Sequence, residues 1–219
     1  MAEPAITFGA AASFGTVAGW AEQSSAPSLV KDRASALGAT GNEAASVLHN
    51  ERTEVSTPYK ATLAASSPTI PAVIGAVVNS ILLTGISVST TSGDFASMTL
   101  TGHQHTTNPH TAEPTCTHGY AVTVGFGAQD FLGGTASANS DVDSSTLNIT
   151  CQHIDVLGAA GDHLCGQNFN AMVEAETVWN GVPTTGAKAG WDKGSTETRT
   201  TNTGFLQTIV RGTKALVLA

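Results

Sequence analysis

Charged side chains are scarce in this sequence. Asp, Glu, Lys and Arg make up 12% of the 219 residues, about half of the usual share. This composition argues against a helical bundle, whose exposed faces are rich in Glu, Lys and Arg. The nine Lys and Arg residues form no cluster, and the formal net charge is −8. Because contacts to phosphate need clustered cations, we expect no tight binding to nucleic acid.

Cysteine, basic leader segments and long apolar runs are also lacking. There are three cysteines, Cys116, Cys151 and Cys165. That number is odd and too small for a disulfide framework, so we expect free thiols. The N-terminal segment lacks the basic region of a secretory signal, and polar residues interrupt the most apolar stretch, residues 70–86. We therefore expect a protein made inside the cell that keeps this stretch in its core.

Catalytic signatures are missing as well. The sequence has no G-x-S-x-G nucleophile elbow and no Walker A phosphate-binding loop. Cys165 follows His163 by two positions, but neighbours in sequence do not make a catalytic dyad. Four acidic loop residues lack the spacing of a calcium-binding EF-hand: Asp141, Asp143, Asp155 and Asp162. We expect neither enzymatic activity nor a cofactor.

The sequence is rich in alternation of apolar and polar residues with a period of two, which is typical of half-buried strands. Residues 86–102 predict a hairpin that turns at 92–94, with Ile86 and Val88 on the same side as Met98 and Leu100. In residues 169–179 the same pattern points five side chains inward: Phe169, Ala171, Val173, Ala175 and Trp179. Further strands are predicted over 51–63, 120–126, 146–154 and 205–218.

Helix signals are few. Apolar spacing predicts one helix over residues 71–83, although Val and Ile crowd it and Gly75 weakens it. Long polar connections are expected over 21–46, 103–118, 127–141 and 180–204. We predict one mainly β domain over residues 1–219 with an extended N-terminal region. Its expected form is a single β-sandwich or partly closed barrel with long loops and at most one or two short helices.

Residues 101–120 read TGHQHTTNPHTAEPTCTHGY and concentrate four of the seven histidines. His103 and His105 share a face if the preceding strand runs that far, and two such imidazoles can share a metal. No zinc pattern such as C-x-x-C or H-E-x-x-H is present, so we predict a polar connection without bound metal. The alternative is a metal site, with or without enzymatic activity, whose ligands are His103, His105, His110 and His118, with Cys116 as a further candidate ligand.

Two stretches carry a resemblance to a known class of proteins. Residues 28–63, SLVKDRASALGATGNEAASVLHNERTEVSTPYKATL, show a polar strand, a turn rich in Gly and Asn, and a second strand that returns antiparallel. Residues 81–105, ILLTGISVSTTSGDFASMTLTGHQH, follow as a hairpin. This order resembles phage tail-tube proteins and other virion structural proteins, including the tubes of contractile injection machines. The similarity extends over about residues 5–105 and rests on a composition that is poor in charge and on a mainly β pattern of residues.

The resemblance implies a β-sandwich or partly closed barrel whose hairpins, from six subunits, join into a ring. Stacked rings would enclose a channel in which DNA is a passing cargo that is not bound, and no catalytic residues would be involved. The implied partners are other copies of the chain and other virion proteins, with no membrane. The implied location is the virion, after synthesis in the host cytoplasm. An acidic chain suits such a channel, because like charges keep a polyanion from sticking.

Other functions remain open at this point. One is a capsid decoration or neck protein, and another is a β-sandwich module that binds carbohydrate or surface ligands. Binding modules of this kind present exposed aromatic residues, and the chain has only three Trp and two Tyr. For assembly, we expect the hairpin of residues 86–100 to expose strand edges that pair with a neighbouring copy, since Asp94 is its only charge.

Overall fold

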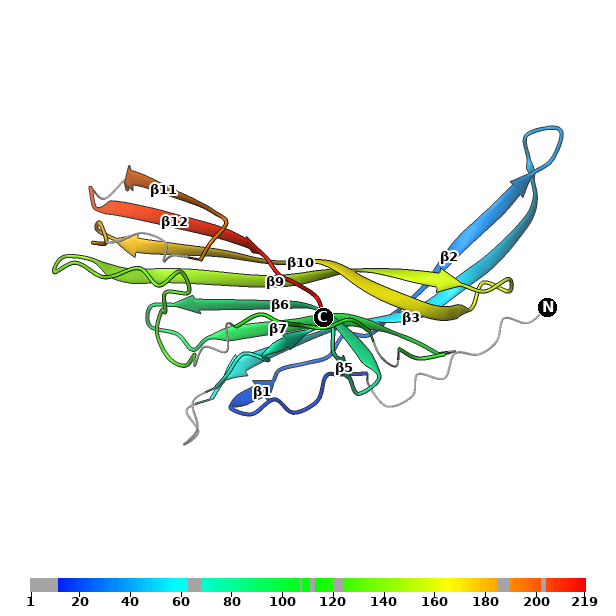
Figure 1. The fold of residues 1–219 in the computed structure, drawn as a ribbon, viewed down its shortest axis with the longest axis horizontal. Helices are drawn as coiled ribbons and strands as arrows, with labels where there is room; N and C mark the ends of the chain where they lie inside the picture. The colour runs from blue at the N-terminus through cyan, green and yellow to red at the C-terminus, as the bar shows by residue number, and fades with distance from the viewer. Residues whose placement is uncertain are drawn as a thin grey trace.

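The protein is an elongated all-β molecule (Figure 1). The computed structural model describes residues 12–62, 68–106, 108–110, 113–119, 124–184, 190–201 and 204–219. Within them every helix or strand element is a strand: β1 (Trp20–Glu22), β2 (Ser28–Leu37), β3 (Glu43–Ala61), β4 (Val73–Ile74), β5 (Val77–Val78), β6 (Ile81–Thr91), β7 (Ser97–His105), β8 (Cys116–Thr117), β9 (Asp141–Leu157), β10 (His163–Asn180), β11 (Lys193–Thr200) and β12 (Leu206–Ala215).

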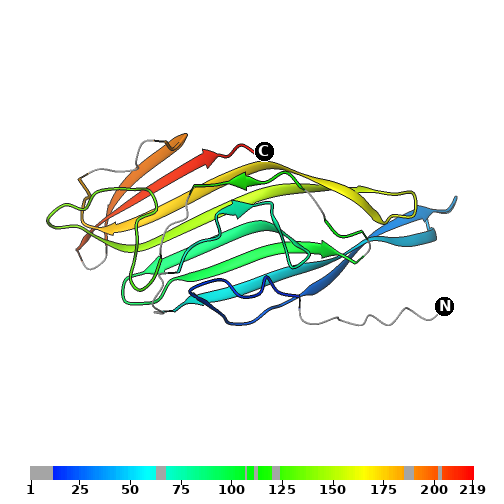
Figure 2. The ribbon, with the colours of Figure 1, turned by 60° about the horizontal axis from the view of Figure 1, so that its bottom comes forward.

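Ten of the strands form one antiparallel sheet. Its order is β1-β3-β7-β6-β9-β10-β12-β11, with β2 added beside β3 and β5 beside β6. The strands β4 and β8 pair into a small second sheet that lies over the large one (Figure 2). The mainly β prediction is therefore confirmed, and the arrangement is sandwich-like. The large sheet is not closed into a barrel.

The predicted hairpin is present and forms the centre of the core. The register places Val88 of β6 opposite Met98 of β7 on one side and opposite Leu147 of β9 on the other. The next inward row is Ile86, Leu100 and Ile149. All six side chains are at most 2% exposed. Burial of such apolar area is the main force that stabilises a sheet of this kind.

The predicted helix over residues 71–83 is wrong. That segment forms β4, β5 and the start of β6 instead. Three backbone positions explain this: Gly75, Asn79 and Ser80 have φ of 84°, 50° and 66°. Positive φ at Asn79 and Ser80 makes the two-residue turn that joins β5 to β6. The apolar residues Ile74, Ile81 and Leu83 still reach the core, but Ile74 does so from β4 and the other two from the start of β6.

One inward assignment is also wrong. Phe169 is 42% exposed, whereas Ala171, Val173 and Trp179 are buried as predicted. A register shift between Phe169 and Met172 interrupts the pairing of β10 with β9, and Asn170 has φ of 49°. An irregularity of this kind reverses the alternation of side chains, so residues before it face the other way.

The expected free edges of the 86–100 hairpin are not free. Strand β3 covers β7 and strand β9 covers β6 over the length of the hairpin. Val88 and Met98 are at most 1% exposed, so a lysine at either position would disrupt the core rather than an interface. The strand predicted over 120–126 falls largely outside the described residues.

The strand–turn–strand predicted over residues 28–63 is confirmed. It is the β2–β3 hairpin, which extends beyond the body of the sheet (Figure 1). Two predicted connections, 21–46 and 180–204, therefore contain strands, β2 and β11. All three cysteines are free thiols, of which Cys116 and Cys151 are buried and Cys165 is exposed. The described residues include no helix that is long and apolar enough to cross a membrane.

Candidate metal centre

Five of the seven histidines meet at one place. Neighbouring ring centroids lie between 4.1 Å (His105 to His163) and 5.7 Å (His103 to His105) apart. Two carboxylates, from Asp155 and Glu113, lie among the rings. The histidines of this cluster are His103 and His105 from β7, His110 from the connection that follows, His153 from β9 and His163 from β10. We call these seven residues the histidine cluster.

The cluster forms beside the start of β6. Leu82, the second residue of β6, pairs with His103 of β7, and the chain before it turns away into β5. Beyond that point β7 and β9 are joined by side chains, because His105 of β7 contacts Asp155 of β9. Strand β10 adds His163, and its Gly166 leaves room for the ring of His153. A Cβ at Gly166 would lie 2.4 Å from Nε2 of His153.

The cluster is buried and holds no basic side chain as a counter-charge. The side chains of His105, His110 and His163 are at most 2% exposed. Those of Glu113 and Asp155 are 5% and 13% exposed. Among the residues that the structure describes, no Lys or Arg forms an ion pair with either carboxylate. Buried carboxylates normally have a cationic partner, and here that charge has to come from a protonated histidine or from a bound cation.

Hydrogen bonds at Nδ1 fix the orientation of four rings. Nδ1–H of His105 donates to the carbonyl of Glu51 (3.2 Å), and Nδ1–H of His163 donates to that of Asn108 (2.7 Å). Nδ1–H of His110 donates to the carboxylate of Glu113 (3.2 Å). Since a neutral imidazole carries one proton, the lone pair in each of these rings is then on Nε2.

The fourth ring, His153, is held by Asn168. The Asn168 amide nitrogen donates to the carbonyls of Pro114 (2.8 Å) and Gly75 (3.3 Å). This leaves its side-chain oxygen to accept from Nδ1–H of His153 at 2.8 Å. The direction of this amide therefore places a proton on Nδ1 of His153, so Nε2 carries the lone pair whenever this ring is neutral.

The Nε2 atoms converge on one carboxylate oxygen. Oδ1 of Asp155 lies 3.0 Å from Nε2 of His153, 3.1 Å from that of His105 and 3.5 Å from that of His163. Nε2 of His105 and of His153 donates to this oxygen only when the ring is protonated, and a neutral ring needs a cation between its lone pair and the carboxylate. Among the residues that the structure describes, four buried atoms of the cluster find no hydrogen-bond partner: Nε2 of His103, His110 and His163, and Oε2 of Glu113.

The pKa values follow from this arrangement. Burial, reinforced by neighbouring imidazoles, lowers the pKa of His103 to about 3 and that of His110 to about 4. Burial also disfavours charge on His153, but contacts with Asp155 and Asn168 outweigh it, and the pKa of His153 is raised. Burial of Asp155 is outweighed in the same way by His105 and His153, which hold its pKa well below the usual range.

The structure revises the ligand set considered from sequence. It brings His103, His105 and His110 together, but His118 lies elsewhere and its Nε2–H donates to the carbonyl of Pro71. Cys116 is buried in the apolar core, where burial raises its pKa. The stretch is not a simple polar connection, because His103 and His105 are part of β7. Sequence reasoning missed four members of the cluster: Glu113, His153, Asp155 and His163.

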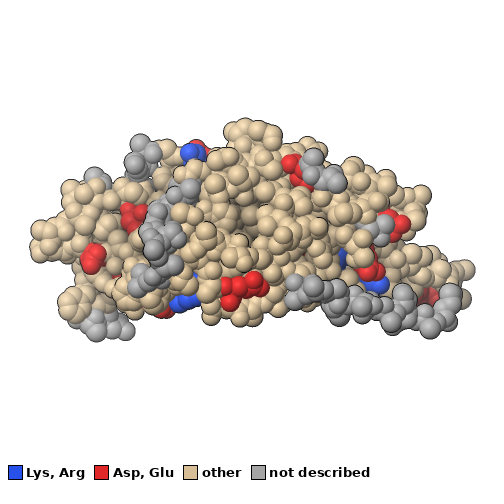
Figure 3. All heavy atoms as spheres, turned by 90° about the horizontal axis from the view of Figure 1, so that it is seen from below, with Lys and Arg blue, Asp and Glu red and all other residues tan. Residues whose placement is uncertain are grey.

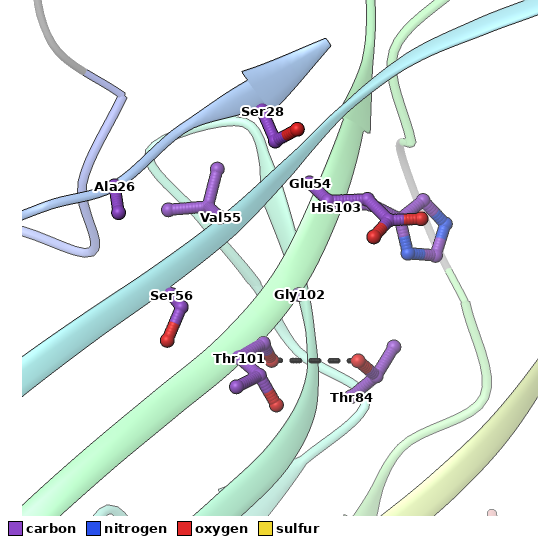
Figure 4. Close-up of a pocket in the computed structure, with 9 residues that line it drawn as sticks. All are labelled: Ala26, Ser28, Glu54, Val55, Ser56, Thr84, Thr101, Gly102 and His103. Atoms are coloured by element: carbon purple, nitrogen blue, oxygen red, sulfur yellow. Dashed lines mark hydrogen bonds between the residues drawn. The ribbon is translucent and has the colours of Figure 1, made fainter. Parts of the chain in front are cut away.

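A depression of about 440 Å³ lies beside the cluster (Figure 4). Its wall includes Glu54 of β3 and Thr84 of β6, and Oγ1 of Thr84 donates to the carbonyl of Thr101 at 3.4 Å. His103 also lines this depression while its ring contacts His105, His110 and His153. One half-buried imidazole therefore separates the depression from the interior of the cluster.

No protein-family model matches the chain, and no curated protein matches it at a significant level.

Proposed function

We propose that the protein is a self-assembling structural subunit of a virion, in the class of phage tail-tube proteins, and that its copies join through the β2–β3 hairpin. The observation that carries the proposal is the outer half of this hairpin. From Glu43 to His49, β3 pairs only with β2. An isolated two-stranded hairpin is marginally stable in water, so this segment gains stability when a partner covers it.

The outer half of the hairpin exposes apolar side chains on both faces, and one of the two faces is apolar at every position of two successive pairs. Ala34 lies opposite Val47, and Ala36 lies opposite Ala45, so these four side chains point to the same side. All four are exposed, and Val47 is 60% exposed. The residues between them point to the other side, where Ser35 lies opposite Ser46 and Arg33 lies opposite the exposed Leu48. An exposed apolar face of this kind marks a surface for contact with another protein.

A second copy of the chain is the partner that fits this face best. The large sheet ends in unclosed edges at β1 and β11, where a strand of a neighbour can pair. The surface is poor in charge, and Figure 3 shows a face on which charged side chains are few and scattered. Docking of another copy therefore requires little desolvation of charged groups. The ring of six, the stacked tube and passing DNA follow from the resemblance of residues 28–63 and 81–105.

The competing functions differ in what they need from the surface. A carbohydrate-binding module needs exposed aromatic platforms, but Trp20, Tyr59 and Trp179 are at most 6% exposed. Within the described part of the chain, the large exposed aromatic side chains are three phenylalanines from separate segments: Phe126, Phe169 and Phe205. A capsid decoration or neck protein would use the same hairpin against a different virion protein. Assembly of the purified chain with itself distinguishes a tail-tube subunit from a decoration or neck protein.

Electron microscopy and sedimentation of the purified chain test the proposal. We expect rings or tubes at high protein concentration, and we expect Val47→Lys to weaken assembly at least about tenfold, since burying one Val contributes about 1.5 kcal/mol or more. Ser46→Lys is the matched control: it adds the same charge one residue away on the opposite face and should assemble nearly as wild type. Both variants should keep the wild-type melting temperature. A wild-type chain that stays monomeric, alone and with the proteins that initiate tube assembly, would refute the proposal.

A further inference from the structure

We propose that the histidine cluster binds one divalent transition-metal ion, with Nε2 of His110, His153 and His163 and the carboxylate of Asp155 as ligands. The ligand atoms of these four residues lie within 4.8 Å of one another. In a tetrahedral zinc site, with Zn–N of about 2.1 Å, neighbouring ligand atoms are about 3.4 Å apart. The side chains need to move only by roughly 1 Å to close around an ion.

The donor set indicates which ions fit. Three imidazole nitrogens and one carboxylate oxygen suit Zn²⁺ and the neighbouring first-row ions, whereas Ca²⁺ and Mg²⁺ prefer oxygen ligands alone. No thiolate takes part, since Cys116 and Cys151 lie in the apolar core. We therefore take Zn²⁺ as the probe, and Co²⁺ as its spectroscopic substitute.

The surroundings of the ligands are those of a metal site. Each ligand histidine donates its Nδ1–H to an oxygen: Glu113 for His110, Asn168 for His153 and the Asn108 carbonyl for His163. Such bonds fix the ring and direct the Nε2 lone pair at the ion. The hydrogen bond from His110 to Glu113 also makes the imidazole a stronger metal ligand, because the carboxylate stabilises the positive charge that the ring gains when Nε2 binds a cation.

Charge balance points to the same conclusion. Asp155 and Glu113 bring two negative charges into a buried site that has no Lys or Arg ion pair among the described residues. A divalent cation neutralises both. It also resolves the repulsion between Oδ1 of Asp155 and the Nε2 lone pairs, and it gives partners to the buried Nε2 atoms of His110 and His163.

A second group of four residues also comes within 4.8 Å: His103, His105, His110 and Asp155. We prefer the first group because all three of its histidines are held at Nδ1 by oxygen atoms. His103 is only half-buried and lines the depression of Figure 4. This position suits a residue on the route of the ion from solvent to the cluster. His105 stacks on His163 at 4.1 Å and supports its ring.

Calorimetric titration of the chelator-treated full chain with Zn²⁺ tests the proposal. We expect one ion per chain, a rise in melting temperature with Zn²⁺, and the visible absorption of four-coordinate Co²⁺ when Co²⁺ is added instead. His110→Ala, His153→Ala and Asp155→Asn should each weaken Zn²⁺ binding at least about 100-fold. The matched control is His49→Ala, which removes a histidine outside the cluster and should bind as wild type.

The variants also decide between the two groups. His103→Asn should keep affinity within about tenfold of wild type, whereas loss of binding in His103→Asn but not in His153→Ala would overturn the ligand set. Asp155→Asn is nearly isosteric, so it serves if an alanine variant fails to fold, with circular dichroism as the check. A folded wild-type chain that takes up neither Zn²⁺ nor Co²⁺ stoichiometrically would overturn the proposal. None of these outcomes depends on whether the chain assembles.

Discussion

Strand β9 passes through two different interiors. Its inward series begins with Leu147, Ile149 and Cys151, which pack in the apolar core, and continues in the same alternation to His153 and Asp155. The first part is stabilised by burial of apolar area, which needs no further component. The second part buries lone pairs and carboxylates and is complete only when a cation is present. One strand therefore contributes both to an apolar core, whose stability does not depend on metal or pH, and to a polar site, whose stability depends on both.

Truncation in the apolar half should have the largest effect. Ile149 is fully buried, and Ile149→Ala should lower the free energy of unfolding by about 3 kcal/mol, because it removes buried area and leaves a cavity. The loss should be equal with Zn²⁺ and with chelator. Ile154→Ala is the control on the same strand: Ile154 is 57% exposed, and its truncation should change stability by less than about 0.5 kcal/mol. Urea unfolding measures both, and a Zn²⁺-dependent loss at Ile149 would contradict the separation of the two halves.

In contrast to Ile149→Ala, the loss of stability in Asp155→Asn should depend on whether Zn²⁺ is present. With chelator present the substitution should lower stability at neutral pH, because the depressed pKa of Asp155 means that its charged form stabilises the folded chain. At a Zn²⁺ concentration 100 times the wild-type dissociation constant, the ion should add about 2.7 kcal/mol to the stability of wild type and almost nothing to the variant. Thermal unfolding of both proteins in both conditions checks this. Equal stabilisation of wild type and variant by Zn²⁺ would place the ion elsewhere.

Acidification should destabilise the metal-free protein. The pKa values of His103 and His110, about 3 and 4 when folded, lie below the value of about 6.5 in an unfolded chain. Below pH 6.5 the unfolded chain therefore binds more protons, and stability falls toward pH 4 by about 1.4 kcal/mol per pH unit for each extra proton. His153, whose pKa is raised, offsets part of this loss. The other titratable groups that face these rings are His105, His163, Asp155 and Glu113.

Urea unfolding in chelator at pH 7, 6 and 5 measures this pH dependence. We expect the unfolding free energy to fall at each step and to fall less in His110→Gln, which removes one of the two histidines with a lowered pKa. Stability that is constant or rises on acidification would contradict the assigned protonation states.

A smaller effect is expected at Gly166. A methyl group there would lie 2.4 Å from the ring of His153, which is held by Asn168 and cannot move freely. Gly166→Ala should weaken Zn²⁺ binding roughly fivefold, about 1 kcal/mol. The control is Gly158→Ala on the same hairpin, whose methyl group would meet only Leu164, at 3.4 Å, and should leave Zn²⁺ affinity unchanged. Equal Zn²⁺ affinity in both variants would show that the His153 ring is not a ligand.

Alternation in the sequence was sufficient to predict the central strands and their inward faces. It failed at Asn170, and the apolar spacing that predicted a helix failed at Asn79 and Ser80, because positive φ at a single Asn or Ser leaves no mark in the pattern of polar and apolar residues. In the strand predicted over 146–154, His153 lies on the same side as Leu147, Ile149 and Cys151. The pattern of Leu147, Ile149 and Cys151 thus pointed two polar residues into the interior, and this is the signal that could have located the site.

The rest of the cluster depends on tertiary structure. His163 reaches His105 only because β10 folds back on β9 and because β6, which separates β7 from β9, begins at Ile81 and does not extend between their far ends. His118 lies almost as near in sequence to His110 as His103 does, yet it follows β8, which belongs to the other sheet. Spacing within residues 101–120 therefore could not distinguish ligands from bystanders, since the partners come from strands about 50 residues away.

The most direct test of the account is the position of the ion itself. Crystals of the Zn²⁺-loaded chain, measured on both sides of the zinc absorption edge, should show one anomalous peak about 2.1 Å from Nε2 of His110, His153 and His163. A peak bounded by His103 and His105 instead, or saturating Zn²⁺ with no peak in the cluster, would contradict the account.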